Sequence, residues 1–165
     1  NLALAMATVY WIHTLANNAR LGTMPRPQGG DALPTEIASL KLQGVNVLVC
    51  LLEEKEIEKL QLRAEQQLAL QAGIEYRHFP IADFTLPPAA DSTNDLIALL
   101  QNDLDAGRNI AIHCHGGIGR STLIAGAVLI NLGFSPQQAL ELISEKRGKP
   151  VPDTEEQKQW VLNRG

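Results

Sequence analysis

The stretch from Asn109 to Leu132 constrains the fold of this chain more than any other part of its sequence. It opens with NIAIH, a short apolar run typical of a buried strand, and the glycine-rich segment CHGGIGRS follows directly. From Arg120 to Leu132 the chain is apolar nearly all round, which predicts a helix buried in the middle of a domain. The sequence therefore predicts a strand, a glycine-rich loop and a buried helix in direct succession.

The rest of the chain alternates between short strand patterns and helix patterns. Strands are predicted over 8–13, 20–24, 46–52, 75–79 and 109–113, and helices over 35–42, 53–72, 91–106, 120–132, 136–147 and from after Asp153 to Leu162. Such alternation favours a three-layer α/β fold, in which a central, mostly parallel sheet of about five strands is flanked by helices. Because the 165 residues contain no internal repeat and no long linker, a single domain over 1–165 is expected.

Composition excludes several functional classes. The 14 basic and 18 acidic side chains give a formal charge of −4, which argues against a nucleic-acid partner. Two cysteines cannot make a disulfide framework, so a reducing, cytoplasmic setting is expected. No apolar run is long enough for a membrane helix, and the apolar residues 1–9 lack the basic region of a signal peptide. We therefore expect a monomer without membrane or nucleic-acid partners.

The segment from Cys114 to Arg120 has the residues of an anion site with a nucleophile in it. Ligands of open α/β sheets bind at the carboxyl ends of strands, where a glycine-rich turn can point successive N–H groups inward. The helix that follows adds the positive end of its dipole, and a cysteine in that setting is stabilised as the thiolate. Arg120 is placed to bind a phosphate through two hydrogen bonds. The expected phosphate-binding residues are His115, Gly116, Gly117, Ile118, Gly119 and Arg120, with Cys114 as the nucleophile.

Two other kinds of site fit this segment poorly. A nucleotide P-loop requires glycine where Cys114 stands and lysine where Arg120 stands. A zinc site would use His113, Cys114 and His115, but no second ligand cluster and no C-x-x-C spacing completes it. Neither a metal nor another cofactor is expected.

The stretch from Ile112 to Ser121 resembles the His-Cys-x5-Arg-Ser signature of cysteine-dependent protein phosphatases. Together with HFPIAD at 78–83, it is most similar to compact dual-specificity members, especially those like the kinase-associated phosphatase. The resemblance implies a protein tyrosine phosphatase-like fold and a reaction in which Cys114 attacks phosphorus and water then hydrolyses the cysteinyl-phosphate. It also implies that Ser121 hydrogen-bonds the sulfur and that His113 orients and tunes the thiolate from behind.

The same resemblance implies a general acid, an aspartate on a mobile loop after the preceding strand. Asp83, in PIADFTLPP, matches that position and has the flanking prolines expected of a lid. Asp91 is the reserve candidate, but it also fits the N-cap of the following helix. Asp83 is preferred, because a loop suits proton donation better than a cap does.

The substrate is expected to be a phosphoprotein that carries phosphotyrosine, with phosphoserine and phosphothreonine also accepted. Apart from Arg120, the loop offers no fixed positive charge, which disfavours polyphosphoinositides. Three alternatives stay open: a phosphatase of lipid or sugar monophosphates, a phosphate-binding module with weak or no turnover, and a sulfurtransferase or arsenate-reducing use of the loop.

Several other residues have ordinary structural interpretations. Cys50 lies inside an apolar strand and is expected to fill the core, with a role as oxidation partner of Cys114 as the alternative. The charged residues of 53–72 are interpreted as a solvated helix face. Arg147 fits a helix C-terminal cation, or a contact to a second phosphate. The side chain of His115 is expected to point outward and to influence substrate preference.

Overall fold

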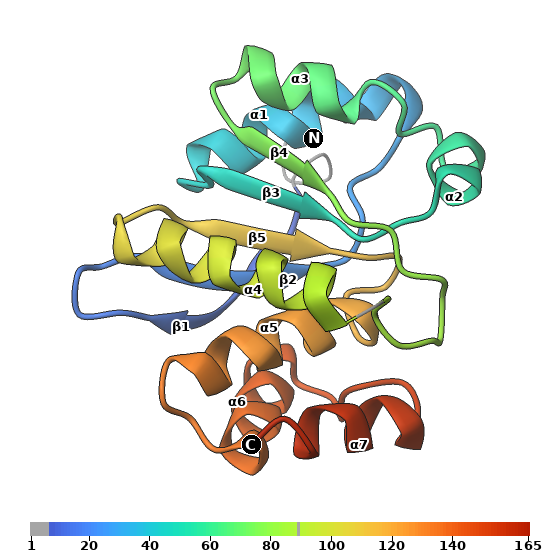
Figure 1. The fold of residues 1–165 in the computed structure, drawn as a ribbon. Coiled ribbons are helices and arrows are strands. Elements are labelled where there is room, and N and C mark those ends of the chain that lie inside the picture. The colour runs from blue at the N-terminus through green and yellow to red at the C-terminus, as the bar shows by residue number, and fades with distance from the viewer. Residues whose placement is uncertain (1–6, 89) are drawn as a thin grey trace.

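The computed structural model describes residues 7–88 and 90–165, and its centre is a five-stranded sheet (Figure 1). The strands are β1 (Tyr10–Thr14), β2 (Arg20–Met24), β3 (Val47–Cys50), β4 (Glu75–His78) and β5 (Ile110–His113). Their order is β1-β2-β5-β3-β4, and only the β1–β2 pair is antiparallel. The predicted mostly parallel α/β sheet is confirmed, with β5 in the middle. The N-terminal residues 1–6, part of the segment considered as a signal peptide, lie outside the described residues.

Helices cover both faces of this sheet. They are α1 (Leu33–Leu42), α2 (Glu54–Lys59), α3 (Glu65–Gln71), α4 (Ala90–Asp105), α5 (Arg120–Asn131), α6 (Pro136–Arg147) and α7 (Glu155–Leu162), with a short 3-10 turn at Gly30–Ala32. In Figure 1, α1 and α3 lie on one face and α4, α5 and α6 on the other, while α7 packs on α5 and α6. Among the described residues, no helix is long and apolar enough to cross a membrane.

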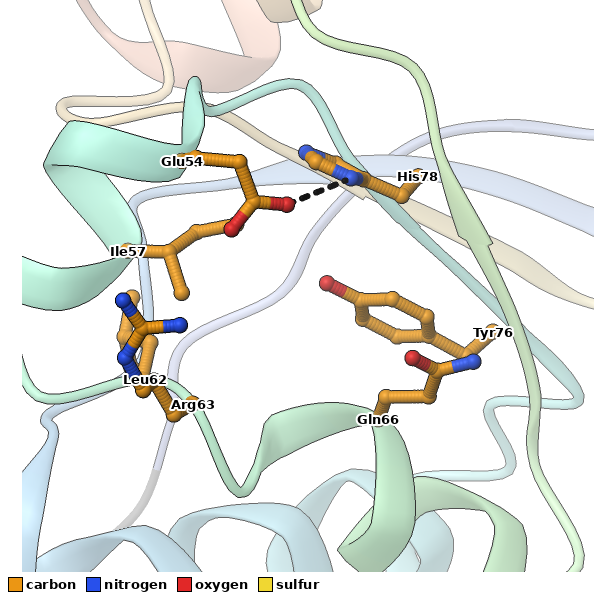
Figure 2. Close-up of a pocket in the computed structure, with 7 residues that line it drawn as sticks. All are labelled: Glu54, Ile57, Leu62, Arg63, Gln66, Tyr76 and His78. Carbon is orange, nitrogen blue, oxygen red and sulfur yellow. Dashed lines mark ion pairs between the residues drawn. The ribbon is translucent and has the colours of Figure 1, made fainter.

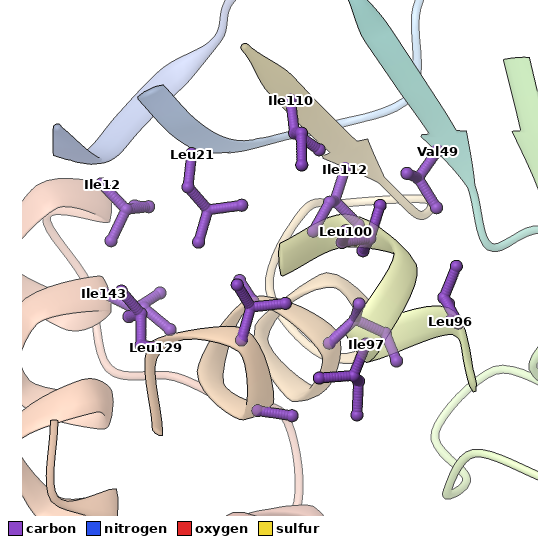
Figure 3. Packing of buried hydrophobic residues seen from close by; sticks show 14 of the residues in the cluster. Ile12, Leu21, Val49, Leu96, Ile97, Leu100, Ile110, Ile112, Leu129 and Ile143 are labelled. Carbon is purple, nitrogen blue, oxygen red and sulfur yellow. The ribbon is translucent and has the colours of Figure 1, made fainter. Parts of the chain in front are cut away.

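The predicted buried helix is confirmed as α5, in which residues 120–129 are all buried. The core around it joins the sheet to three helices, as the labelled side chains of Figure 3 show: Ile12, Leu21, Val49, Ile110, Ile112, Leu96, Ile97, Leu100, Leu129 and Ile143. A buried aliphatic side chain contributes about 1.5–3 kcal/mol relative to an exposed one. Because it is packed on several sides, α5 provides a rigid base for the loop that precedes it.

The single helix predicted over 53–72 is wrong, because the chain forms two helices, α2 and α3, separated by residues 60–64. The break is fixed by contacts outside the segment: Gly30 N–H donates to the Gln61 carbonyl at 2.9 Å, and Leu62 is buried in the core. Gln61 adopts a φ of 58°, which ends the helical path. Ala64, in the segment between the two helices, is exposed as a result.

Some helix ends also differ from the prediction. α1 begins before Thr35, and α4 begins at Ala90, so neither Thr35 nor Asp91 is an N-cap. Leu42 and Leu99, two large apolar residues of the predicted helices, are 84% and 43% exposed. A capping box starts α6, in which Ser135 Oγ accepts from the backbone N–H of Gln138.

Candidate active site

The loop of residues 114–119, the 114–119 loop, connects the end of β5 to the start of α5. It lies at the carboxyl edge of the sheet, where the parallel strands β2, β3, β4 and β5 all end. A cleft of about 320 Å³ opens there, lined by Asp83, Phe84, Cys114, His115, Gly116, Ile118 and Asp153. The structure thus brings the predicted nucleophile, much of the predicted phosphate-binding loop and Asp83 together.

The backbone of the 114–119 loop has the form of an anion site. In the described chain, the N–H groups of residues 115–119 donate no hydrogen bond to a carbonyl or a side chain. Gly117 has a φ of 73°, and a Cβ there would lie 2.6 Å from the carbonyl carbon of Met24. Only glycine fits both demands at this position. The loop therefore keeps its N–H groups available while packing closely against the end of β2.

Arg147 holds this loop from the side opposite the cleft. The Arg147 side chain is buried, and its Nε and Nη2 donate to the carbonyls of Gly117 and Gly116 at 3.0 and 3.2 Å. In a trans peptide, the C=O and the next N–H point in opposite directions, so the N–H groups of Gly117 and Ile118 face away from Arg147. Its guanidinium also stacks on the Tyr10 ring at 3.8 Å. Arg147 is thus a support of the loop, which neither sequence interpretation included.

Cys114 occupies the bottom of the cleft, with only 2% of the residue exposed. Its Sγ lies 3.4 Å from Oγ of Ser121, a hydrogen-bonding distance for sulfur. Ser121 is fully buried in the first turn of α5, so its hydroxyl has little freedom to turn elsewhere. The structure places this hydroxyl beside the sulfur, and its hydrogen bond to the thiolate stays a prediction.

Arg120 is 1% exposed and is held in place by three partners. Its Nη1 and Nη2 donate to the two carboxylate oxygens of Glu56 at 2.7 and 2.9 Å, and Nη1 also donates to the Ile81 carbonyl. Asp83 lies 3.2 Å from Nη2. Burial lowers the pKa of Arg120, but Glu56, Cys114 and Asp83 together raise it, so the guanidinium stays charged. The buried Nε has no partner among the described residues, and it is a donor that a ligand oxygen can use.

Glu56 is the main site residue that the sequence interpretation missed. It was assigned to a solvated helix face, whereas its carboxylate is the bidentate partner of Arg120 and also accepts from the N–H of Glu53 at 3.0 Å. Burial raises the pKa of Glu56, but the hydrogen bonds from Arg120 and from the Glu53 backbone together lower that pKa by more than burial raises it. The Glu56 carboxylate therefore stays ionised. The available signal was position, because Glu56 lies in the first turn of α2, just after the carboxyl end of β3, where ligands bind.

Glu56→Gln is expected to lower kcat/KM for an aryl phosphate about tenfold, because Arg120 loses one charge-assisted hydrogen bond and becomes free to turn. Steady-state hydrolysis measures the effect. Glu58→Gln in the same helix removes an exposed carboxylate and is the matched control, with an expected change of less than twofold. A Glu56→Gln enzyme as active as this control would contradict the assigned role of Glu56.

A buried ion pair lies behind the loop. Nε2 of His113 is 2.6 Å from Glu65, and both side chains are fully buried. Nδ1 of His113 lies 3.2 Å from the Cys114 carbonyl, to which it can donate. Burial lowers the pKa of His113, but attraction to Glu65 outweighs it and holds that pKa well above its usual value. His113 thus contacts the start of the loop from behind, and its tuning of the thiolate stays a prediction. Its buried partner Glu65 was not part of that prediction.

Tyr76 links the His113–Glu65 ion pair to a second cavity. The Tyr76 hydroxyl lies 3.4 Å from Glu65, and the same tyrosine lines a cavity of about 190 Å³ whose other lining residues Figure 2 shows: Glu54, Ile57, Leu62, Arg63, Gln66 and His78. Cys50 is packed in the core on this side of the sheet, whereas Cys114 belongs to the core on the other side. The structure therefore agrees with Cys50 as a core residue.

Glu65→Gln is expected to lower the free energy of unfolding by about 3 kcal/mol near pH 6, because the charge on buried His113 loses its partner. His113 binds its proton more tightly when folded, so its contribution is complete below pH ~6.5 and is lost as pH rises through the higher folded-state pKa. The difference in the free energy of unfolding between wild type and Glu65→Gln should therefore become smaller as pH rises. Denaturant unfolding at several pH values measures this, with exposed Glu145→Gln as control. A gap that widens with pH would contradict the ion pair.

The two predicted general-acid candidates lie in different places. Asp83 lines the cleft, and its side chain is 41% exposed beside Arg120. Asp91 is exposed in the first turn of α4 and is not among the residues that line the cleft. The geometry favours Asp83. A second carboxylate in the cleft, Asp153, was read from the sequence only as the residue before the last helix.

Comparison with known proteins points to a family of phosphatases. A family model described as "Polymorphic toxin system, DSP-PTPase phosphatase" matches residues 22–134. A human protein named Cyclin-dependent kinase inhibitor 3 is 32% identical over 124 residues, which cover 74% of this chain and 58% of that protein. A Dictyostelium discoideum protein named Probable protein tyrosine phosphatase type IVA A is 40% identical over 81 residues, 47% of this chain and 48% of that protein. The chain thus spans less than two thirds of the length of either relative.

Solved structures of the same kind have this fold. Kinase associated phosphatase with its catalytic site cysteine substituted by serine matches at a TM-score of 0.83 and 25% identity, covering 94% of this chain and 92% of that one. Tk-PTP in its active form matches at a TM-score of 0.74 and 24% identity, covering 94% and 93%. The predicted phosphatase-like fold and the family resemblance are both confirmed. With a family model that spans most of its sequence and a loop of the expected form, this chain belongs to the DSP-PTPase family of phosphatases.

Proposed function

We propose that this protein removes phosphate from phosphoproteins through a cysteinyl-phosphate on Cys114. One observation carries the proposal: Cys114 and the 114–119 loop line a cleft, and Arg120 lies 3.2 Å from Asp83 of the same cleft. Within the described chain, the N–H groups of residues 115–119 and the buried Nε of Arg120 have no partner. A phosphate group supplies the acceptors that these donors need. The relative whose catalytic site cysteine was substituted supports the assignment of the nucleophile.

Phosphate binding would use the free side of the Arg120 guanidinium. Nη1 and Nη2 hold Glu56, so the edge formed by Nε and Nη2 is left for the phosphoryl oxygens. Asp83 shares Nη2 at 3.2 Å, and a bound phosphate would take its place there.

In the first step, Cys114 Sγ attacks phosphorus and the bond from phosphorus to the ester oxygen breaks. The leaving oxygen takes the proton of the Asp83 carboxyl, while the loop N–H groups and Arg120 stabilise the transferring phosphoryl group. In the second step, water attacks phosphorus, the S–P bond breaks and inorganic phosphate leaves. Ser121, 3.4 Å from the sulfur, would donate to the thiolate as it departs.

The substrate we propose is phosphotyrosine in proteins, with phosphoserine and phosphothreonine also accepted. The cleft opens beside the 62% exposed ring of Phe84, which offers an apolar surface to a phosphotyrosine ring. No lysine stands among residues 115–119 to bind a further phosphate. The names of the family model and of the Dictyostelium relative support a protein phosphatase.

A substrate panel tests this proposal. The purified chain, kept under a thiol reductant, is assayed for phosphate release from p-nitrophenyl phosphate, phosphotyrosine, phosphoserine and phosphothreonine peptides, a phosphoinositide and a sugar monophosphate. We expect the highest kcat/KM on phosphotyrosine peptides and measurable turnover of the other two peptides. Preference for the lipid or the sugar phosphate would contradict the substrate class, and tight peptide binding without turnover would contradict the activity.

A further inference from the structure

Asp153 is joined to the loop of Asp83 by one buried side chain. Gln157, fully buried in α7, accepts through Oε1 from the backbone N–H groups of Asp153 and Thr154 at 3.1 and 3.2 Å. Its Nε2 donates to the carbonyl of Thr85, two residues after Asp83, at 3.1 Å. The two aspartate-bearing loops are therefore fastened to each other and face the same cleft.

The carboxylate of Asp153 points to the end of the 114–119 loop. A Cβ at position 119 would fall on its Oδ2, so glycine at 119 gives this carboxylate its place. Asp153 lines the cleft together with Cys114 and Asp83. Among the described residues, its carboxylate makes no hydrogen bond and no ion pair. An acceptor at the mouth of the cleft is thus left free.

The charges around Asp153 make it a better proton acceptor than an ordinary aspartate. Burial and the charge of Asp83 raise the pKa of Asp153, and the charge of Arg120 opposes them only in part. A stronger base accepts a proton from water more readily. Asp83, by contrast, has Oδ1 engaged by the N–H of Phe84 at 3.0 Å and by Arg120. The two carboxylates therefore have different partners and suit different steps.

We propose that Asp153 is a second acid–base group of this site, which takes the proton of the water that hydrolyses the cysteinyl-phosphate. This inference rests on the proposed function. Water would attack phosphorus from the side that the leaving group vacated and would pass one proton to the Asp153 carboxylate. The S–P bond breaks, its electron pair stays on Cys114 as the thiolate, and phosphate departs. Asp83 donates in the first step and Asp153 accepts in the second.

Stopped-flow hydrolysis of p-nitrophenyl phosphate separates the two steps. Asp153→Asn is expected to release one nitrophenolate per enzyme in a fast burst, followed by a steady state about 10²-fold slower than that of wild type. Mass spectrometry of the acid-quenched variant should find the phosphorylated enzyme as the main species. Asp83→Asn should show no burst. Its loss of steady-state rate relative to wild type should be larger for phenyl phosphate, which has the poorer leaving group, than for nitrophenyl phosphate. Exposed Asp91→Asn is the matched control and should behave as wild type.

Two results for Asp153→Asn would contradict the role proposed for Asp153. A steady-state rate within twofold of wild type, without a burst, would overturn the proposal. Loss of the first step in Asp153→Asn, with a strong leaving-group dependence, would overturn the assigned step. Because the carboxylate lacks partners and faces Asp83, the variant should unfold at the same temperature as wild type or higher, so misfolding would be recognised. If wild type itself releases no nitrophenolate, the proposed function fails before Asp153 is tested.

Discussion

Cys114→Ser is expected to lower kcat by about 10⁴-fold or more, because a serine hydroxyl in this loop has no base to activate it as a nucleophile. The substitution replaces the sulfur by an oxygen and leaves the loop N–H groups and Arg120 in place. Binding of a phosphotyrosine peptide should therefore persist, with a Kd close to the wild-type KM. Steady-state hydrolysis and calorimetric titration measure the two quantities on the same preparation.

Cys50→Ser is the matched control for Cys114→Ser, since it changes the other buried cysteine in the same way. It lies in the core on the opposite side of the sheet from Cys114 and should keep most of its activity, with some loss of stability. Substantial turnover by Cys114→Ser, or an equal loss in both variants, would remove the basis for a cysteine nucleophile.

Arg120→Lys is expected to lower kcat/KM by about 10³-fold although the positive charge is kept. Lysine cannot hold both oxygens of Glu56 at 2.7 and 2.9 Å and offer a second edge to a phosphate. The loss should appear mainly in kcat, because the planar contact matters most while charge spreads over the transferring phosphoryl oxygens. Initial rates over a range of substrate concentrations separate kcat from KM.

Arg108→Lys is the matched control, which tests whether the loss of kcat/KM is specific to the arginine at position 120. Arg108 also pairs with carboxylates, Glu75 and Asp103, but its side chain is 38% exposed and it pairs with neither Glu56 nor Asp83, the carboxylates that hold Arg120. Its conversion to lysine should change kcat/KM by less than twofold. A comparable loss in both variants, or a mild effect of Arg120→Lys, would contradict recognition through the guanidinium.

Features coded by consecutive residues could be predicted from the sequence. The strand, the loop from Cys114 and helix α5 follow one another directly, so apolar pattern, glycine placement and helix start all point to the same structure. The capping box of α6 at Ser135 is local in the same sense. Once β5 ends at His113, the direction of the chain forces Cys114 to the carboxyl edge of the sheet, where ligands bind.

Features that depend on pairing across the chain could not be predicted in this way. Glu56 meets Arg120 across 64 residues, and Glu65 meets His113 across 48. Both glutamates lie in a segment whose charged residues resemble a solvated face until the break after α2 turns Glu65 inward. Asp153 lines the cleft from a loop that the buried amide of Gln157 ties to the segment after Asp83, 72 residues away along the chain.

The central claim is that phosphate passes through the sulfur of Cys114, and rapid acid quenching tests it most directly. Wild-type enzyme is mixed with one equivalent of p-nitrophenyl phosphate, quenched within the first turnover, digested and analysed by mass spectrometry. We predict one phosphate on the peptide that carries Cys114, formed at the rate of nitrophenolate release and absent from Cys114→Ser. Turnover without any phosphate on that cysteine, or phosphate on another residue, would contradict the mechanism.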